Sequence, residues 1–129
     1  MGIIENVSYK DVLEGNHSPA DTLIQIVDPG CEFPRPYYSF KEVYQLNFFD
    51  EASEHVLEDA QALLLINILK GGLLNNKSII VHCHAGICRS GAVVEVALMM
   101  GYELGRGARF RIPNVDVKLK LIACLRNSL

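Results

Sequence analysis

The sequence predicts an α/β fold in which a mostly parallel central sheet is flanked by helices. Runs typical of buried strands alternate along the chain with stretches of helical apolar spacing, and this order favours parallel strands joined by helices. The chain has 129 residues, of which 50% are hydrophobic and 21% charged, enough for a packed core and too apolar for a disordered chain. We therefore expect residues 1–129 to form a single domain.

Three runs are predicted to be strands. Thr22–Val27 is a strand-like run that closes at an Asp-Pro-Gly turn over residues 28–30. Residues 42–48 alternate between apolar and polar positions, as a half-covered strand does. Residues 78–81 are rich in isoleucine and valine, which is typical of a strand buried on both faces.

Three further stretches are predicted to be helices. Residues 54–70 place Leu57, Ala60, Leu64 and Ile68 at helical spacing, with Asp50 or Ser53 as the N-cap and the glycines at 71–72 as the stop. Residues 91–100 are apolar except at one glutamate, so we expect a helix that is buried on most sides and ends at a glycine. Residues 115–126 form an amphipathic pattern.

Composition and charge restrict the partners of the chain. Twelve basic and fifteen acidic residues give a net charge of −3, which argues against nucleic-acid binding, because that activity draws on a basic excess. The first ten residues lack the pattern of a signal peptide, and no apolar run reaches the roughly 18 residues of a membrane helix. We expect a soluble, cytoplasmic protein without membrane or nucleic-acid partners.

One segment carries a chemical signal. Residues 82–90 read His-Cys-His-Ala-Gly-Ile-Cys-Arg-Ser and lie between the predicted buried strand and the apolar helix. A short glycine-containing loop in this position directs backbone N–H groups and a helix N-terminus to one point, which binds anions such as phosphate. The same surroundings lower the pKa of a thiol, here that of Cys83. Arg89 would offer its planar fork to two phosphate oxygens.

This segment resembles the signature of the cysteine-dependent protein tyrosine and dual-specificity phosphatases. The match covers histidine, cysteine, five intervening residues, arginine and then a hydroxyl residue, from His82 to Ser90. The resemblance extends more loosely from about residue 37 to residue 101. It implies the compact fold of the dual-specificity type, and small prokaryotic or viral enzymes of this type are the nearest likeness.

The resemblance also implies roles for individual residues. Cys83 would attack phosphorus and form a phosphocysteine, Ser90 would hydrogen-bond the sulfur and ease its departure, and His82 would support the loop from behind. Arg89 and the amides of the loop would hold the phosphate oxygens, so the substrate-binding residues are His84, Ala85, Gly86, Ile87, Cys88 and Arg89. No metal or other cofactor is implied. The expected substrate is a phosphorylated protein, with phosphotyrosine first and phosphoserine or phosphothreonine next.

A general acid must protonate the leaving oxygen, and Asp50 is the predicted residue. In compact dual-specificity enzymes this aspartate follows a strand about thirty residues before the cysteine, which is where Asp50 stands. Asp50 can instead be a simple helix cap. Glu51, Glu54 and Asp59 are rival carboxylates.

Cys88 suggests a redox function for the same loop. The spacing of Cys83 and Cys88 is also found in the low-molecular-weight tyrosine phosphatases, in which the two thiols can pair reversibly and protect the nucleophile. That family carries its signature near the N-terminus, unlike this chain, so the pairing of Cys83 with Cys88 is a hypothesis. Cys88 as a small buried residue that fills space is the alternative.

Three alternatives to a protein phosphatase stay open. The two histidines and two cysteines within residues 82–88 can be read as a metal site, although a structural zinc site needs a distant second pair of ligands. The loop also suits a phosphatase for a phosphoinositide, a nucleotide or an RNA 5′-phosphate, which the arginines at 106, 109 and 111 would favour. A phosphate-binding module without turnover is the third alternative.

Overall fold

A five-stranded sheet forms the centre of the computed structural model, which describes residues 2–50 and 56–127. The strand order is β3-β2-β4-β1-β5, and all neighbouring strands pair in parallel. The strands are β1 (Ile3–Ser8), β2 (Thr22–Val27), β3 (Glu42–Asn47), β4 (Ser78–Cys83) and β5 (Glu103–Leu104). The described residues thus confirm the predicted α/β class, with a sheet that is parallel throughout.

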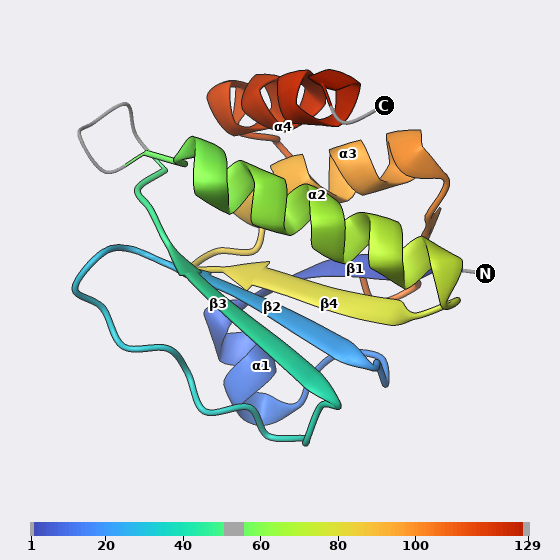
Figure 1. Cartoon of the computed structure of the whole chain (residues 1–129). Helices are drawn as coiled ribbons and strands as arrows, with labels where there is room; N and C mark the ends of the chain where they lie inside the picture. Colours follow the sequence, from blue (N-terminus) through green and yellow to red (C-terminus); the bar gives the residue numbers. More distant parts are fainter. Residues whose placement is uncertain (1, 51–55, 128–129) are drawn as a thin grey trace.

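Helices cover the two faces of the sheet unequally. Three helices lie over one face, and the shortest helix lies on the opposite face together with the long connection between β2 and β3 (Figure 1). The three helices are α2 (Asp59–Leu74), α3 (Arg89–Met100) and α4 (Val115–Asn127), and the short one is α1 (Tyr9–Glu14). The main hydrophobic core joins residues of the sheet with residues of all three helices, and α4 packs on α2 and α3.

The position of each strand in the sheet explains its pattern of polarity. All six residues of β2 are buried, because it lies between two strands and is covered on both faces. β3 shows the alternation that the sequence predicts, and the structure places it at the edge of the sheet. Gln25 is the polar exception inside β2: its amide donates to the Pro34 carbonyl, and Gln45 donates to its oxygen. The first bond holds the long connection between β2 and β3 against the sheet, and the second joins β3 to β2.

Three elements were not predicted from the sequence, namely β1, α1 and β5. β1 pairs with β4 over its whole length, so the first strand of the chain lies beside the strand that precedes the signature loop. α1 begins in a capping box, in which Asp11 N–H donates to the Ser8 hydroxyl and Ser8 N–H donates to the Asp11 carboxylate. β5 has two residues and extends the edge beyond β1.

The first predicted helix is wrong in its ends and in its buried face. α2 begins at Asp59 with Glu58 as N-cap; Asp50 therefore does not cap it, and Ser53 lies outside the described residues. Leu64 is exposed, whereas the buried positions are Ala62, Leu65, Ile66, Leu69 and Gly72. Almost every position in this helix is apolar, so its spacing does not single out one face.

The two glycines do not stop α2, because the second of them is a packing residue within the helix. A Cβ atom on Gly72 would fall 2.1 Å from the Tyr102 hydroxyl. That hydroxyl donates to the Leu69 carbonyl over 2.7 Å. Burial raises the pKa of Tyr102 to about 12, so it stays a neutral hydrogen-bond donor. The helix therefore needs glycine where the ring of Tyr102 approaches its backbone.

The elements around the signature agree closely with the sequence prediction, with small shifts of their ends. β4 runs on through Cys83, and α3 starts at Arg89, so the loop between them is short. Gly101 ends α3 in the left-handed conformation, as predicted. The last helix ends one residue later than predicted.

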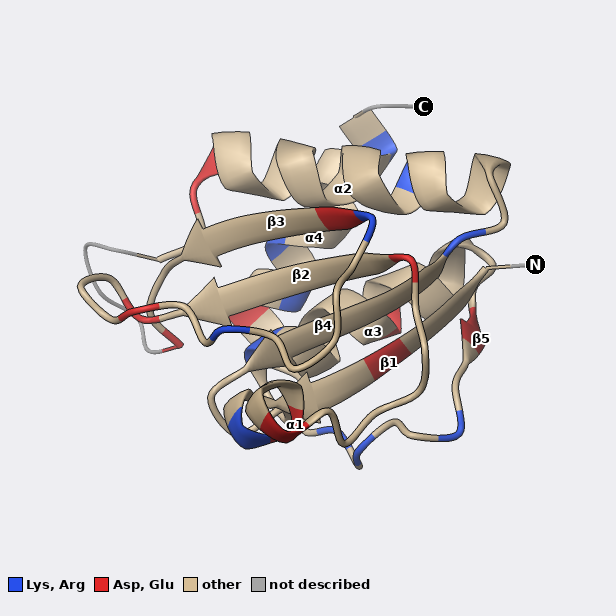
Figure 2. Cartoon of the chain, turned by 90° about the horizontal axis from the view of Figure 1, so that it is seen from below, with Lys and Arg blue, Asp and Glu red and all other residues tan. Residues whose placement is uncertain are grey.

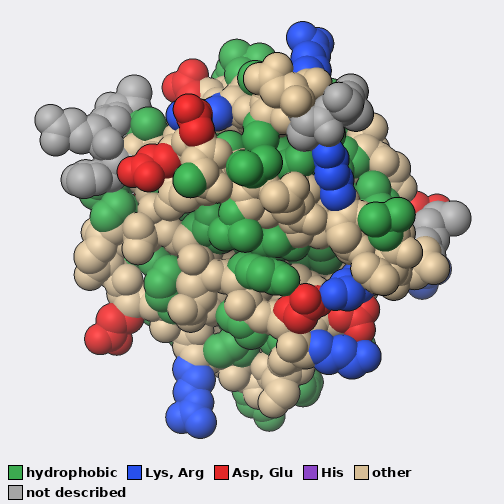
Figure 3. Space-filling model, viewed as in Figure 1, with side chains coloured by type: hydrophobic (Ala, Val, Ile, Leu, Met, Phe, Trp, Pro, Cys, Tyr) green, Lys and Arg blue, Asp and Glu red, His purple; other side chains and the backbone are tan. Residues whose placement is uncertain are grey.

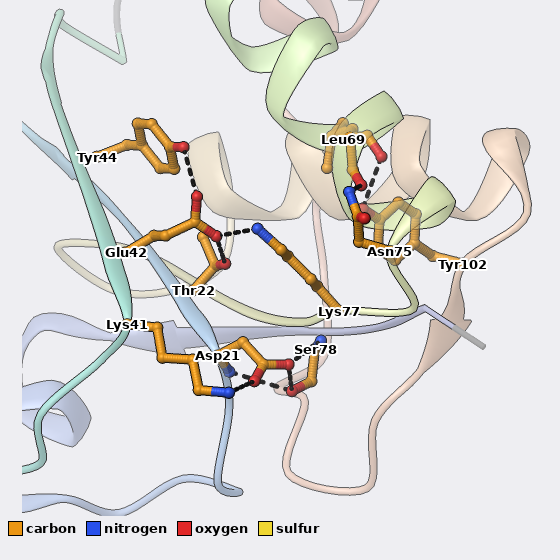
Figure 4. A network of polar contacts seen from close by, with 11 residues as sticks. Asp21, Thr22, Lys41, Glu42, Tyr44, Leu69, Asn75, Lys77, Ser78 and Tyr102 are labelled. Atoms are coloured by element: carbon orange, nitrogen blue, oxygen red, sulfur yellow. Dashed lines mark hydrogen bonds and ion pairs between the residues drawn. The ribbon is translucent and has the colours of Figure 1, made fainter.

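Polar side chains join the amino ends of β2, β3 and β4 (Figure 4). Glu42 accepts from Lys77, Tyr44 and Thr22, and the Lys77 ammonium is the main reason that the pKa of this carboxylate is low. Asp21 accepts from the backbone N–H of Ser78, which lowers the pKa of Asp21. These contacts lie at the end of the sheet away from the signature loop.

Apolar side chains also reach the surface on the face seen in Figure 3, where green groups cross the centre and most charged groups lie around them. Val43, Leu63 and Leu64 are exposed on β3 and α2. Within residues 2–50 and 56–127, no helix combines the length and the apolar character that crossing a membrane requires.

Candidate active site

The signature loop lies where the carboxyl ends of the strands meet. A cleft of about 450 Å³ opens there, as expected at this edge of a parallel sheet. Three of its lining residues follow β2 or β3 and five belong to the signature, so the fold joins segments far apart in sequence. The lining residues are Asp28, Phe49, Asp50, Cys83, His84, Ala85, Cys88 and Arg89.

The carboxyl end of β1 and the segment before α4 hold the outer side of the loop. Tyr9 N–H donates to the His84 carbonyl over 3.1 Å, and the buried Asn6 amide donates to the Gly86 carbonyl over 2.7 Å. Asn114 N–H donates to the Cys88 carbonyl over 3.0 Å. With these three carbonyls turned outward, the amide groups between them are available to the interior of the loop.

Gly86 occupies a position in the loop that admits no side chain. Its φ is +76°, a left-handed conformation that L-residues adopt only with strain. A Cβ atom there would lie 2.4 Å from the carbonyl carbon of Val7 in β1. The loop therefore packs directly against the backbone of a strand that precedes it by about eighty residues.

Cys83 is a buried thiol with several donors around its sulfur. Burial raises the pKa of the thiol, but hydrogen bonds from Ser90 and Gly86 and the charge of Arg89 outweigh this effect, so the pKa lies below its usual value. The Ser90 hydroxyl lies 3.3 Å from Sγ, and the backbone N–H groups of Ser90 and Gly86 also bond to it. These contacts favour the thiolate form of Cys83.

His82 lies behind the loop as a neutral ring. Its Nδ1 is 3.2 Å from the Cys83 carbonyl, and Tyr9 packs edge-on against it at 6.0 Å between ring centres. Burial lowers the pKa of His82 to about 4, so the ring is uncharged at neutral pH and Nδ1 donates its proton to that carbonyl. The ring fixes the backbone at Cys83 and does not line the cleft.

Arg89 is held by two groups that sequence reasoning missed. One of its terminal nitrogens, Nη1, donates to the Asp28 carboxylate over 2.8 Å and to the Phe48 carbonyl over 2.7 Å. Asp28 lies in the Asp-Pro-Gly sequence, which by itself predicts only a turn. Asp28 directly follows a strand, as the region of Asp50 does. Because parallel strands end at the same edge of the sheet, this position could have identified Asp28 as a residue of the cleft.

Asp50 also lines the cleft, and Asn114 holds it there. The Asn114 amide donates to Asp50 Oδ1 over 2.7 Å and also to the Asp50 backbone carbonyl. The oxygen of the same Asn114 side chain accepts from Val117 N–H and caps α4. Asn114 thus ties Asp50 to the signature loop, because its own N–H bonds Cys88.

The other predicted residues of the loop are placed in different ways. His84 and Ala85 are exposed and line the cleft, whereas Ile87 is half-buried and does not line it. Cys88 is half-buried at the start of α3 and is a free thiol, as is Cys83. Burial and the carboxylate of Asp50 raise the pKa of Cys88.

Several competing candidates lie away from the cleft. Asp59 pairs with Lys120 beside α4, and the rival carboxylates Glu51 and Glu54 lie outside the described residues. Arg109 and Arg111 are paired with carboxylates of Asp11 and Glu95, and Arg106 lines a hollow beside β5. Across the part of the chain that the structure describes, no three His, Cys, Asp or Glu side chains form a group able to hold a metal ion.

Comparisons with known proteins give a likeness in structure but none in sequence. No model of a protein family and no curated protein matches the sequence. Among solved structures, the chain is similar to OH1 from the Orf virus, described as a tyrosine phosphatase with distinct structural features and triple substrate specificity. The TM-score is 0.47 and the identity 17%, over 92% of this chain. The chain spans 62% of the length of the OH1 chain. At this identity no residue roles follow from the likeness.

Proposed function

We propose that this chain is a metal-independent phosphomonoester hydrolase that acts through a phosphocysteine intermediate. The observation that carries the proposal is the environment of Cys83: its thiol receives three hydrogen bonds and lies in one cleft with Arg89 and Asp50. A low thiol pKa supplies the thiolate, and the loop amides with Arg89 supply a binding site for the phosphoryl oxygens.

The first chemical step forms the phosphocysteine. The Cys83 thiolate attacks phosphorus, an S–P bond forms and the bond to the leaving oxygen breaks. Asp50 gives its proton to that oxygen; because Asn114 holds Oδ1, we expect Oδ2 to carry the proton. Arg89 and the loop amides stabilise the charge on the three remaining oxygens.

The second step releases phosphate. Water attacks phosphorus while the Asp50 carboxylate accepts its proton, and the S–P bond breaks. The departing sulfur gains negative charge, which the Ser90 hydroxyl stabilises from 3.3 Å. Ser90 therefore acts mainly on this step, and neutral His82 keeps the backbone of Cys83 in place throughout.

The favoured substrate is a phosphorylated protein, with phosphotyrosine first. Two carboxylates, Asp28 and Asp50, line the cleft, and Figure 2 shows acidic residues on the loops that follow β2 and β3. Of the arginines that would suit a polyanionic substrate, two are neutralised by carboxylates. These charges favour a monoester with a single phosphate over a phosphoinositide or a nucleotide.

Replacing Asp50 by alanine is expected to slow turnover according to the leaving group. An aryl phosphate with a basic, poor leaving group needs protonation, so its kcat should fall roughly 100-fold or more, whereas an acidic leaving group should lose only a few-fold. Steady-state hydrolysis of a series of aryl phosphates measures how kcat depends on the basicity of the leaving group, which is the leaving-group slope. Reductant and a metal chelator are present throughout.

Asp59→Ala serves as the matched control for Asp50→Ala, because Asp59 is an exposed rival carboxylate outside the cleft. It should leave the leaving-group slope unchanged. An equal loss on good and poor leaving groups in Asp50→Ala would assign the acid to another residue. Wild-type turnover that disappears with the chelator would contradict the metal-independent mechanism.

We also propose that Cys88 can protect Cys83 from irreversible oxidation. A peroxide converts the Cys83 thiolate to a sulfenic acid, and the Cys88 thiol can then displace water to form a disulfide. Mild peroxide should inactivate the wild type, Cys31→Ser and Cys88→Ser. A dithiol added afterwards should restore the activity of the first two proteins but not that of Cys88→Ser. Equal recovery in all three proteins would assign Cys88 to packing alone.

A further inference from the structure

The position of Asp28 is set by the turn that begins there. Cys31 N–H donates to the Asp28 carbonyl over 3.0 Å, and Gly30 has a φ of +87°. With Pro29 between them, this is the arrangement of a type II turn, which fixes φ at its second position and needs glycine at its third. The turn brings the Asp28 side chain to the wall of the cleft.

Arg89 has two edges, and the described contacts use only one of them. Both N–H groups of Nη1 have acceptors, one in Asp28 and one in the Phe48 carbonyl. Nε and Nη2 form the edge with which a guanidinium grips two oxygens of one phosphate. Among residues 2–50 and 56–127, this edge has no hydrogen-bond acceptor. The contacts therefore orient the guanidinium and leave its phosphate-binding edge available.

We propose that Asp28 is a positioning residue that holds Arg89 in the orientation that receives phosphate. The inference rests on the proposed phosphate chemistry of this cleft. The Arg89 side chain is only 5% exposed, so its charge is buried and needs a fixed partner, whereas Asp28 is 45% exposed. The carboxylate supplies that partner, and the carbonyl of Phe48 at the end of β3 supplies the second contact.

Asp28 also has an opposite effect, because its negative charge repels a phosphate dianion. Water screens this repulsion, since nearly half of the Asp28 side chain is exposed. The hydrogen bond to buried Arg89 is not screened in the same way. We therefore expect positioning to outweigh repulsion. The two effects predict opposite changes in phosphate affinity when Asp28 is removed: loss of positioning weakens binding, and loss of repulsion strengthens it.

The test measures the binding of inorganic phosphate to Cys83→Ser protein, in which no turnover interferes. Asp28→Ala in this background should weaken phosphate binding about tenfold, the value of one hydrogen bond to a charged group. Asp28→Asn keeps an acceptor oxygen and should stay within about threefold. In the enzyme with Cys83 intact, Asp28→Ala should raise KM and lower kcat together, because Arg89 binds the phosphate of the substrate and binds the transition state more tightly still.

Two further variants make the result decisive. Glu32→Ala removes an acidic residue from the same loop without touching Arg89 and should not weaken phosphate binding. The serine side chain in Asp28→Ser is too short to reach Nη1 of Arg89. If Asp28→Ala does not fold, Asp28→Ser should show the same loss of phosphate binding. Binding that is unchanged or tighter without Asp28 would overturn the positioning role. Absence of phosphate binding with Asp28 intact, together with absence of turnover, would instead reject the proposed function and this inference with it.

Discussion

Replacing Cys83 by serine is expected to abolish turnover while the protein still binds phosphate. A serine hydroxyl at this place is not ionised, so it lacks the nucleophilic thiolate that the surrounding donors favour in Cys83. Turnover of an aryl phosphate should fall at least roughly 10⁴-fold. Binding of inorganic phosphate should be retained, because Arg89 and the loop amides remain in place. Steady-state rates and a phosphate titration measure the two effects.

The matched control is Cys31→Ser, which changes an exposed cysteine outside the cleft and should keep full activity. Residual turnover in Cys83→Ser close to that of the wild type would contradict the phosphocysteine mechanism. A wild-type chain that binds phosphate but turns over no aryl phosphate would be a recognition module.

Replacing Gly86 by alanine is expected to disrupt the loop as a whole. The new Cβ would meet the backbone of Val7 at 2.4 Å, and the residue would keep a left-handed φ. Together the strain and the overlap should cost about 3 kcal/mol of unfolding free energy. For a chain of this length, that lowers Tm by about 10 °C. Displacement of the amides should reduce turnover roughly 100-fold.

Gly101→Ala separates the two causes of the Gly86 effect. Gly101 has a φ of +118°, but a Cβ there would have no neighbour within 4 Å. In this variant only the strain of the left-handed backbone should lower the free energy of unfolding, by about 1 kcal/mol, and the activity should be kept. Thermal unfolding followed by a rate measurement compares the two variants. If both lose stability equally and both keep activity, then the packing of Gly86 against β1 does not support the site.

The signature could be recognised from the sequence because its parts are neighbours along the chain. An apolar strand, a short loop and an apolar helix place Cys83, Arg89 and Ser90 around one point through local geometry alone. The structure brings Cys83, Ser90 and Gly86 into contact. Asp50 lies in the same cleft, as predicted, although its role as general acid stays a prediction.

The buried face of α2 could not be predicted, because its sequence offers apolar residues on nearly every side. Only packing in the tertiary structure distinguishes Leu65, which belongs to the main core, from exposed Leu64. Gly72 was also misleading, because glycine usually interrupts a helix. Here it lies within the helix and leaves room for the ring of Tyr102.

By itself, the sequence determined the α/β class and the strand-loop-helix unit, and it predicted Cys83 as the nucleophile, because these inferences depend on the order of neighbouring residues. Only the tertiary structure decided what supports that loop and what orients its arginine. Asn6 and Gly86 are 80 residues apart, and Asp28 and Arg89 are 61 apart. Such pairs leave no local pattern, because they meet only when parallel strands align their carboxyl ends at one edge of the sheet.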